Sequence, residues 1–172
     1  MKFQTRITSK ELFQFLMKHS YAGFHGKIGL VISLAAAVLF VMKIPDCSGN
    51  ESAMVILGLI ALLFTVIQPL SLWMKAKQQK IANPAYKNEM EYTLTEEGVN
   101  LQAGEQKGGI SWDLIIKVVE TKSLYILYTT RINAFLWPKK DMGEQEESMI
   151  RFMLDHIDSD SVKLPKRMRS RK

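Results

Sequence analysis

Apolar residues are concentrated in two uncharged stretches in the first half of the chain. The longer stretch, residues 52–74, contains 23 residues without a charge, and the shorter one, residues 28–42, contains 15. A helix rises about 1.5 Å per residue, so the longer stretch would measure roughly 35 Å, enough to cross a hydrocarbon core of about 30 Å. The pattern predicts a hairpin of two transmembrane helices, at residues 21–43 and 52–75, joined by a loop at residues 44–51.

The first span has an alternative interpretation, because a stretch of this length would also suit the buried helix of a soluble protein. Extension back to Tyr21 lengthens the stretch, which is then interrupted only by His25 and Lys27. A lysine near a helix end reaches the lipid headgroups with its long side chain. A cleaved signal peptide is disfavoured, because a long charged segment precedes the stretch and no A-x-A cleavage site follows it. We therefore expect a membrane span here.

Neither uncharged stretch contains the ionisable residue that would mark an ion or proton path. Their polar residues include Ser33, Thr65, Gln68 and Ser71, and Pro69 is expected to kink the second helix. We expect Gln68 to bond to the neighbouring helix or to a carbonyl group freed by Pro69. The alternative is that Gln68 and Pro69 lie at a helix interface in an oligomeric transporter or channel.

A strand and an amphipathic helix are expected within residues 1–20. Residues 3–7 alternate apolar and polar side chains, which is typical of a strand. Thr8 and Glu11 have the spacing of a capping box, which predicts a helix over residues 9–20. This helix either lies on the inner leaflet of the membrane or packs against the soluble domain.

Strand-like alternation follows a basic linker, residues 76–87, in which Asn83-Pro84 ends the preceding helix. Strands are expected at residues 89–94, 99–103, 110–113, 114–122, 123–130 and 134–137, with turns at 95–98 and 104–109. From Gly143 the apolar residues recur every three or four positions, which predicts a helix. This order predicts an α+β domain over residues 88–160, in which an antiparallel sheet is closed by a C-terminal helix. A basic tail, residues 161–172, follows.

The distribution of the net charge of +6 predicts how the hairpin is oriented. Lysines flank the hairpin on the N-terminal side of its first span and on the C-terminal side of its second, whereas the connection between the spans offers only Lys43. Positive residues close to membrane spans are retained in the cytoplasm. We therefore expect a multi-pass protein of the inner or plasma membrane, with both termini cytoplasmic and residues 44–51 outside.

Two basic clusters are candidate contacts for anionic lipid headgroups, which attract lysine and arginine by about 1 kcal/mol per residue near a membrane surface. They comprise Lys75, Lys77, Lys80, Lys166, Arg167 and Arg169. A basic tail also suits nucleic acid, but the tether makes lipid the nearer partner, so no nucleic acid is expected. The alternative is a solvated tail that only follows the topology rule.

Residues that would support catalysis are few. His19, His25 and His156 lack the spacing of a metal site, and Cys47 is either a free thiol or a bridge to a second copy. The sequence contains no phosphate-binding loop, nucleophile elbow or metalloprotease motif. We therefore expect no catalytic, metal or cofactor site and no enzymatic activity.

Four segments of the domain resemble the YcxB-like family of bacterial membrane proteins. They are Tyr92-Thr-Leu-Thr-Glu-Glu-Gly98, Ile110-Ser-Trp-Asp-Leu-Ile-Ile-Lys-Val-Val-Glu120, Leu124-Tyr-Ile-Leu-Tyr128 and Pro138-Lys139-Lys140. The resemblance covers residues 3–157. It implies a short N-terminal strand and helix, two transmembrane helices and a C-terminal domain similar to bacterial pleckstrin-homology (PH) folds. It implies no reaction.

Trp112, Asp113 and Pro138 match the family pattern and are candidate groove or motif positions. Trp112 and Asp113 either line a ligand groove or serve the fold, with Trp112 in the core and Asp113 capping a turn or pairing with a lysine. Residues 133–137 depart from the family, because they carry bulkier aromatic side chains than the expected aliphatic run.

These expectations combine into an α+β membrane protein, a transmembrane helical hairpin that carries a cytoplasmic PH-like domain. We expect a membrane-anchored binding or scaffold module that engages a protein or an anionic lipid at the inner membrane surface. The alternative is a small subunit of an oligomeric transporter or channel, and a homo-oligomer is compatible with both.

Overall fold

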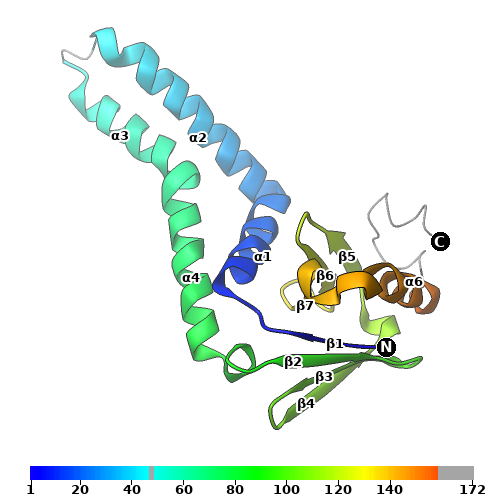
Figure 1. Cartoon of the computed structure of the whole chain (residues 1–172). Helices are drawn as coiled ribbons and strands as arrows, with labels where there is room; N and C mark the ends of the chain where they lie inside the picture. The colour runs from blue at the N-terminus through cyan, green and yellow to red at the C-terminus, as the bar shows by residue number, and fades with distance from the viewer. Residues whose placement is uncertain (47–48, 159–172) are drawn as a thin grey trace. The chain divides into compact units, whose positions relative to one another are not determined.

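The first strand of the chain is followed by a long helical hairpin, and the next three strands after the hairpin belong to the same sheet as the first (Figure 1). The computed structural model describes residues 1–46 and 49–158. It divides into two units, which we name the sheet unit (Met1–Glu11 and the residues from Lys80 onward) and the helical unit (Leu12–Gln79). The helical unit is therefore an insertion between the first two strands of the sheet unit.

The first sheet of the sheet unit has four antiparallel strands in the order β1-β2-β3-β4. Their bounds are β1 Lys2–Thr5, β2 Met90–Leu94, β3 Gly98–Ala103 and β4 Gln106–Ser111. The pairing of β1 with β2 places Phe3 opposite Tyr92, although about 85 residues separate the two strands. The predicted N-terminal strand thus belongs to the sheet of the C-terminal domain, a point that the sequence left open.

The second sheet has three antiparallel strands, β5 Lys117–Glu120, β6 Leu124–Tyr128 and β7 Ala134–Pro138. All five residues of the central strand β6 are buried, so both of its faces are covered. The expectation of one antiparallel sheet is therefore wrong in number: the strands form two sheets.

Aromatic side chains join the two sheets. Phe3 and Tyr92 stack with ring centroids 5.1 Å apart, and Trp137 of β7 meets Phe3 edge-on at 5.6 Å. Phe135 meets Tyr92 edge-on at 6.0 Å. The bulky residues before Pro138, where the resemblance implied an aliphatic run, thus form the contact between β7 and the first sheet, and aromatic pairs there add to the energy of burial.

Two helices follow β7. The four-residue helix α5, Lys139–Met142, was not predicted, and α6, Glu146–His156, corresponds to the predicted closing helix. Helix α6 buries Met149, Ile150, Met153 and Leu154, the three- and four-residue spacing of one helix face. The expected turn at residues 104–109 is shorter, because β4 already begins at Gln106, and the expected strand at 114–122 is reduced to β5.

The helical unit contains most of α1, Ser9–Ala22, then α2, Phe24–Lys43, and a continuous helix of 32 residues, Glu51–Ala82. This second long helix consists of α3, Glu51–Leu62, a π-helical segment, Leu63–Ile67, and α4, Gln68–Ala82. Small residues of α2 form its buried stripe, Gly26, Gly29, Ser33 and Ala36. The Phe64 ring lies against Gly29, where a Cβ atom would be 2.2 Å from the ring.

The π-helical segment is stabilised by two hydroxyl groups. The Ser33 hydroxyl donates to the Ile60 carbonyl at 2.8 Å and accepts from the Phe64 N–H at 3.3 Å, so it lies between two groups that pair directly in an α-helix. The Tyr21 hydroxyl donates to the Phe64 carbonyl at 2.5 Å, because the Gln68 N–H bonds to Leu63 instead. The second helix changes direction at this segment, just before Pro69 (Figure 1).

Candidate functional site

The outer face of the first sheet carries two rows of polar side chains. Strand β2 buries Met90, Tyr92 and Leu94, so Glu91 and Thr93 face the other way. The strand register extends each into a row across the sheet. One row is Gln4, Glu91, Gln102 and Lys107, and the other is Lys2, Thr93, Asn100 and Gly109. Alternation along each strand therefore assembles a polar surface from residues far apart in the sequence.

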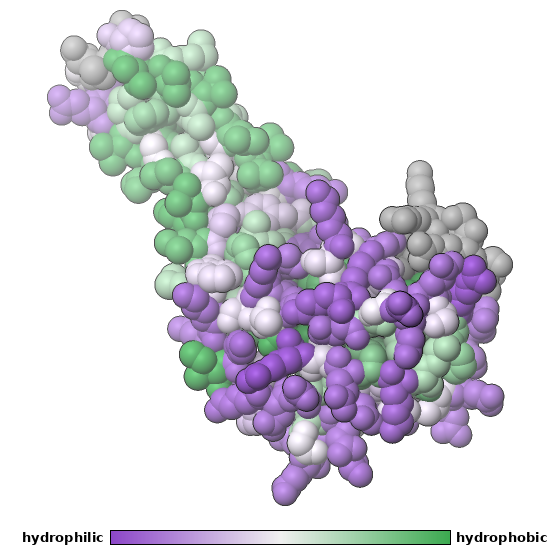
Figure 2. Space-filling model, in the orientation of Figure 1, coloured by the Kyte–Doolittle hydropathy of each residue, from purple (hydrophilic) through white to green (hydrophobic). Residues whose placement is uncertain are grey.

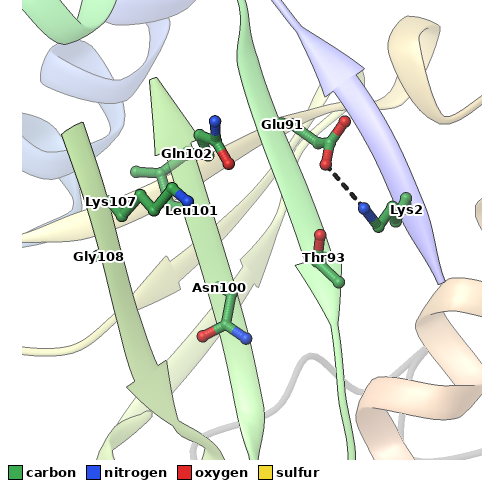
Figure 3. Close-up of a pocket in the computed structure, with 8 residues that line it drawn as sticks. All are labelled: Lys2, Glu91, Thr93, Asn100, Leu101, Gln102, Lys107 and Gly108. Atoms are coloured by element: carbon green, nitrogen blue, oxygen red, sulfur yellow. Dashed lines mark hydrogen bonds and ion pairs between the residues drawn. The ribbon is translucent and has the colours of Figure 1, made fainter. Parts of the chain in front are cut away.

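These rows border a shallow groove of about 420 Å³, which we name the sheet groove. Figure 3 shows its lining, contributed by all four strands: Lys2, Glu91, Thr93, Asn100, Leu101, Gln102, Lys107 and Gly108. Amide and hydroxyl groups make up much of this lining. Such groups donate and accept hydrogen bonds without net charge, which suits the recognition of another polypeptide.

The two lysines of the sheet groove differ in their surroundings. Lys2 Nζ lies 3.0 Å from Glu91 Oε1, and the Gln4 amide donates to the other carboxylate oxygen at 3.4 Å. The hydrogen bonds from Lys2 and Gln4 lower the pKa of Glu91. Within residues 1–46 and 49–158 no ion pair involves Lys107. Lys107 is therefore the cation of the groove that remains for a ligand.

The two edges of the first sheet also differ. The outer strand β1 contacts α5, where the Thr5 hydroxyl donates to Asp141 at 2.5 Å. The other outer strand, β4, pairs with β3 alone among the strands that the structure describes, and five of its six residues are exposed. The groove is thus bordered by an exposed strand edge.

Trp112 lies in the core of the sheet unit. Its side chain is buried, its indole N–H donates to the Thr95 carbonyl at 2.9 Å, and its ring lies 6.4 Å from Phe152 and 6.0 Å from His156 of α6. Asp113 is exposed in the 3-10 turn that follows β4. Neither residue lines the sheet groove.

Pro138 ends β7 and is buried, and the two lysines after it contact different elements. Lys139 Nζ lies 2.7 Å from Glu120 of β5 and 3.9 Å from Glu146 of α6. Lys140 Nζ lies 2.7 Å from Glu11, at the start of α1. The two lysines of the segment Pro138-Lys139-Lys140 therefore connect β5, α6 and Glu11, which all belong to the sheet unit.

The Lys140 contact completes the predicted capping box. Glu11 accepts the Thr8 N–H at 2.6 Å, and the Thr8 hydroxyl accepts the Glu11 N–H at 3.4 Å. Burial raises the pKa of Glu11, but the hydrogen bonds from Lys140 and Thr8 outweigh it, so the pKa lies below its usual value. The same hydrogen bond raises the pKa of Lys140.

The candidate lipid contacts Lys75, Lys77 and Lys80 do not line the sheet groove. Lys75 and Lys77 are exposed on α4, with Lys77 Nζ 5.1 Å from the centre of the Trp73 ring, and Lys80 is half-buried. The remaining candidates, Lys166, Arg167 and Arg169, lie outside the described residues, as does Cys47. The proposal that these residues contact lipid stays a prediction.

The groove residues were not identified from the sequence. The alternation of Glu91 and Thr93, and of Asn100 and Gln102, does indicate one polar face for each strand. The missing information was the register, and above all the place of β1, which brings Lys2 beside Glu91. Among the residues that the structure describes, no group of three histidine, cysteine or acidic side chains has the arrangement of a metal site.

Comparison with known proteins finds a similarity between part of the sheet unit and a protein family. Neither the search of curated proteins nor the search of solved structures found a match. The model of the family described as "YcxB-like protein" matches residues 94–153, from the end of β2 to the third turn of α6. This segment includes all three family positions predicted from the sequence, Trp112, Asp113 and Pro138. The predicted resemblance is thus confirmed over residues 94–153, which are similar to the YcxB-like family.

Proposed function

We propose that this protein is a membrane-anchored binding module, in which the helical unit anchors the chain and the sheet unit binds a partner protein through the sheet groove. The sheet unit would be a PH-like domain at the cytoplasmic surface. Four- and three-stranded antiparallel sheets followed by a C-terminal helix support this assignment. Lys75 and Lys77 would contact anionic headgroups beside the second span.

The surface of the long helices supports membrane anchoring. Two helices, Phe24–Lys43 and Glu51–Ala82, are long and apolar enough to span a bilayer. Large apolar side chains such as Val31, Val38 and Val55 are more than half exposed. Figure 2 shows hydrophobic residues over α2 and α3, whereas hydrophilic residues cover much of the visible surface of the sheet unit. An exposed apolar surface of this kind is costly in water and suits lipid.

The pairing of β1 with β2 supports two crossings rather than one. Residues before and after the helical unit belong to the same sheet, so both ends of the hairpin lie on one side of any membrane that it enters. Because positive residues beside membrane spans stay in the cytoplasm, the lysines that flank the hairpin indicate that this side is the cytoplasmic side.

A membrane extraction tests the anchor. The full-length chain should remain in the membrane pellet after washing with alkaline carbonate, which releases peripheral proteins. Recovery of the folded chain in the supernatant would contradict the proposed anchor.

The sheet groove is the observation that carries the proposed binding function, because it combines hydrogen-bonding side chains, an exposed strand and Lys107, which forms no ion pair within the described part of the chain. A photo-crosslinking amino acid at Gln102, in the groove, should yield a discrete protein adduct in living cells. The same group at Glu144, exposed in the turn after α5, serves as the control and should not yield that adduct.

A second variant distinguishes the groove from general exposure. Thr93→Arg places a long side chain in the groove and should abolish the Gln102 adduct while the membrane level of the protein is unchanged. Identical adducts from Gln102 and Glu144, or an adduct that persists in Thr93→Arg, would overturn the proposal.

A further inference from the structure

The hydrogen-bond pattern of the first sheet determines which main-chain groups of β4 face outward. The Trp112 N–H donates to the Glu97 carbonyl at 3.3 Å, so Glu97 and Trp112 form a hydrogen-bonded pair. The neighbouring pair in the ladder, Gly98 and Ser111, is therefore a non-bonded pair. Hydrogen-bonded pairs alternate with non-bonded pairs in an antiparallel ladder, so the next bonded pairs are 99 with 110, 101 with 108 and 103 with 106. The main-chain groups of Lys107, Gly109 and Ser111 therefore point away from β3.

The ladder between β2 and β3 independently indicates the same alternation of inward and outward main-chain groups. The Thr95 N–H donates to the Gly98 carbonyl at 2.9 Å, so the residues of β3 that bond to β2 are Gly98 and every second residue after it. The main-chain groups of the intervening residues of β3 therefore bond to β4, in agreement with the pattern deduced from Trp112 and Glu97.

The strand that carries this outward row is small and exposed. Two of the six residues of β4 are glycines, and five of the six are exposed. Exposed strand edges with free N–H and C=O groups pair readily with an additional strand. Proteins often protect such an edge with a charged residue, and Lys107 is the one charged side chain of β4.

We propose that the occupant of the sheet groove is an extended segment of a partner protein that adds to β4 as a fifth strand and places an acidic side chain beside Lys107. The inference rests on the proposed binding function and specifies its partner class. The N–H and C=O groups of Lys107, Gly109 and Ser111 would bond to the main chain of the added strand.

The side chains of the groove explain the preference for an acidic residue. Lys107 points to the groove face, in the row that contains Gln102 and Glu91. A carboxylate opposite Lys107 on the added strand would form a cross-strand charge pair. At the next position of this face Gly109 has no side chain, and Asn100 fills the space, since a Cβ atom there would lie 2.5 Å from its Oδ1.

Ser111 provides a matched pair of variants for the test. Its φ of −72° is that of proline, and its N–H belongs to the outward row, so Ser111→Pro removes an edge donor without breaking a bond to β3. Ser111→Ala keeps the donor and controls for the loss of the hydroxyl. Both variants are expected to fold.

The probe is a displayed library of random nine-residue peptides, selected on the purified full-length chain in detergent micelles. Enriched peptides should carry an acidic residue in an otherwise β-prone sequence. For such a peptide, Ser111→Pro should raise the Kd about fivefold or more, whereas Ser111→Ala should leave it unchanged. Lys107→Gln should raise the Kd about two- to fivefold. Peptide binding should also slow amide hydrogen exchange at Lys107 and Gly109 more than at Gly108.

Each outcome bears on the proposal. Equal affinities for Ser111→Pro and Ser111→Ala, or unchanged exchange at Lys107 and Gly109, would overturn strand addition. If the Gln102 adduct nevertheless formed in cells, the binding function would stand with another mode of contact. A dimer of the full-length chain that Ser111→Pro dissociates in the absence of peptide would assign the edge to a second copy and refute the proposed partner.

Discussion

Two buried tryptophans of the sheet unit differ in the partner of the indole N–H group. Trp112 donates to the Thr95 carbonyl at 2.9 Å, whereas the Trp137 Nε1 has no hydrogen-bond partner among the residues that the structure describes. A buried donor without a partner loses its hydration without compensation, so it costs stability. The Trp137 ring nevertheless contributes to the core, because its contacts with Phe3 and Tyr92 join the two sheets.

The same substitution at both tryptophans should therefore have unequal effects. Both replacements remove a similar volume, but Trp112→Phe also leaves the Thr95 carbonyl without a donor, and Trp137→Phe removes the unpaired N–H. We expect Trp112→Phe to lower the free energy of unfolding by about 1 kcal/mol more than Trp137→Phe does. Chemical denaturation followed by circular dichroism measures the difference, and equal losses would show that the unpaired N–H has no energetic effect.

At Glu11, a single carboxyl group should contribute to the acid sensitivity of the sheet unit. Its folded pKa lies below the unfolded value near 4.5, so its stabilisation is present above that pH and is lost as the pH falls through the folded pKa. Glu11→Gln should lower stability at neutral pH by about 1 kcal/mol and flatten the loss of stability below about pH 4.5. Unfolding curves across this range test the prediction, with the exposed Glu144→Gln as the control. Parallel pH profiles for wild type and Glu11→Gln would contradict it.

At the scale of elements, the π-helical segment depends on a residue of another helix. Ser33 supplies a donor and an acceptor to main-chain groups of the second helix, and an apolar surrounding makes the loss of either contact costly.

Replacement of Ser33 should release the π-helical segment. Ser33→Ala should either leave the Ile60 and Phe64 main-chain groups unpaired or let them close into an ordinary α-helical bond. We expect a loss of about 1–2 kcal/mol. Unfolding of the full-length chain in detergent measures the loss, with Ser71→Ala in α4 as the control. A loss no larger than that of the control would show that the hydroxyl does not stabilise the segment.

The sequence predicted elements better than their assembly. The capping box, the apolar helices, most strands and α6 depend on local patterns, and the structure bears them out. Helix α5 was missed because four residues are too few for a helical period. The two sheets and the sheet groove depend on register and on the distant partner of β1, which no local pattern encodes. The hydroxyl groups of Ser33 and Tyr21 bond to main-chain groups of the helix before Pro69, a role that the sequence did not indicate, and the expectation that Gln68 bonds to the neighbouring helix or to a carbonyl freed by Pro69 stays a prediction.

At the scale of the whole molecule, the sheet unit is discontinuous in sequence and should need both of its parts. A chain that joins residues 1–11 to residues 80–172 through a flexible linker of about 12 glycine and serine residues should fold as a soluble protein. Residues 80–172 alone should fail to do so, because the loss of β1 exposes Tyr92 and the edge of β2. Size-exclusion chromatography and thermal unfolding distinguish the two. Equal stability of the two chains would show that β1 is dispensable.

The discontinuous sheet also has a consequence in time. During synthesis β1 leaves the ribosome first, and at about 5–20 residues per second its partner β2 follows only several seconds later. During that interval β1 lacks its pairing partner β2, because both long helices are synthesised before β2. If both long helices cross a membrane, as proposed, the pairing of β1 with β2 would depend on correct insertion: a nascent chain with only one inserted helix would keep β1 and β2 on opposite sides of the bilayer and could not close the sheet. Quality control would then detect a topological error as an unfolded domain.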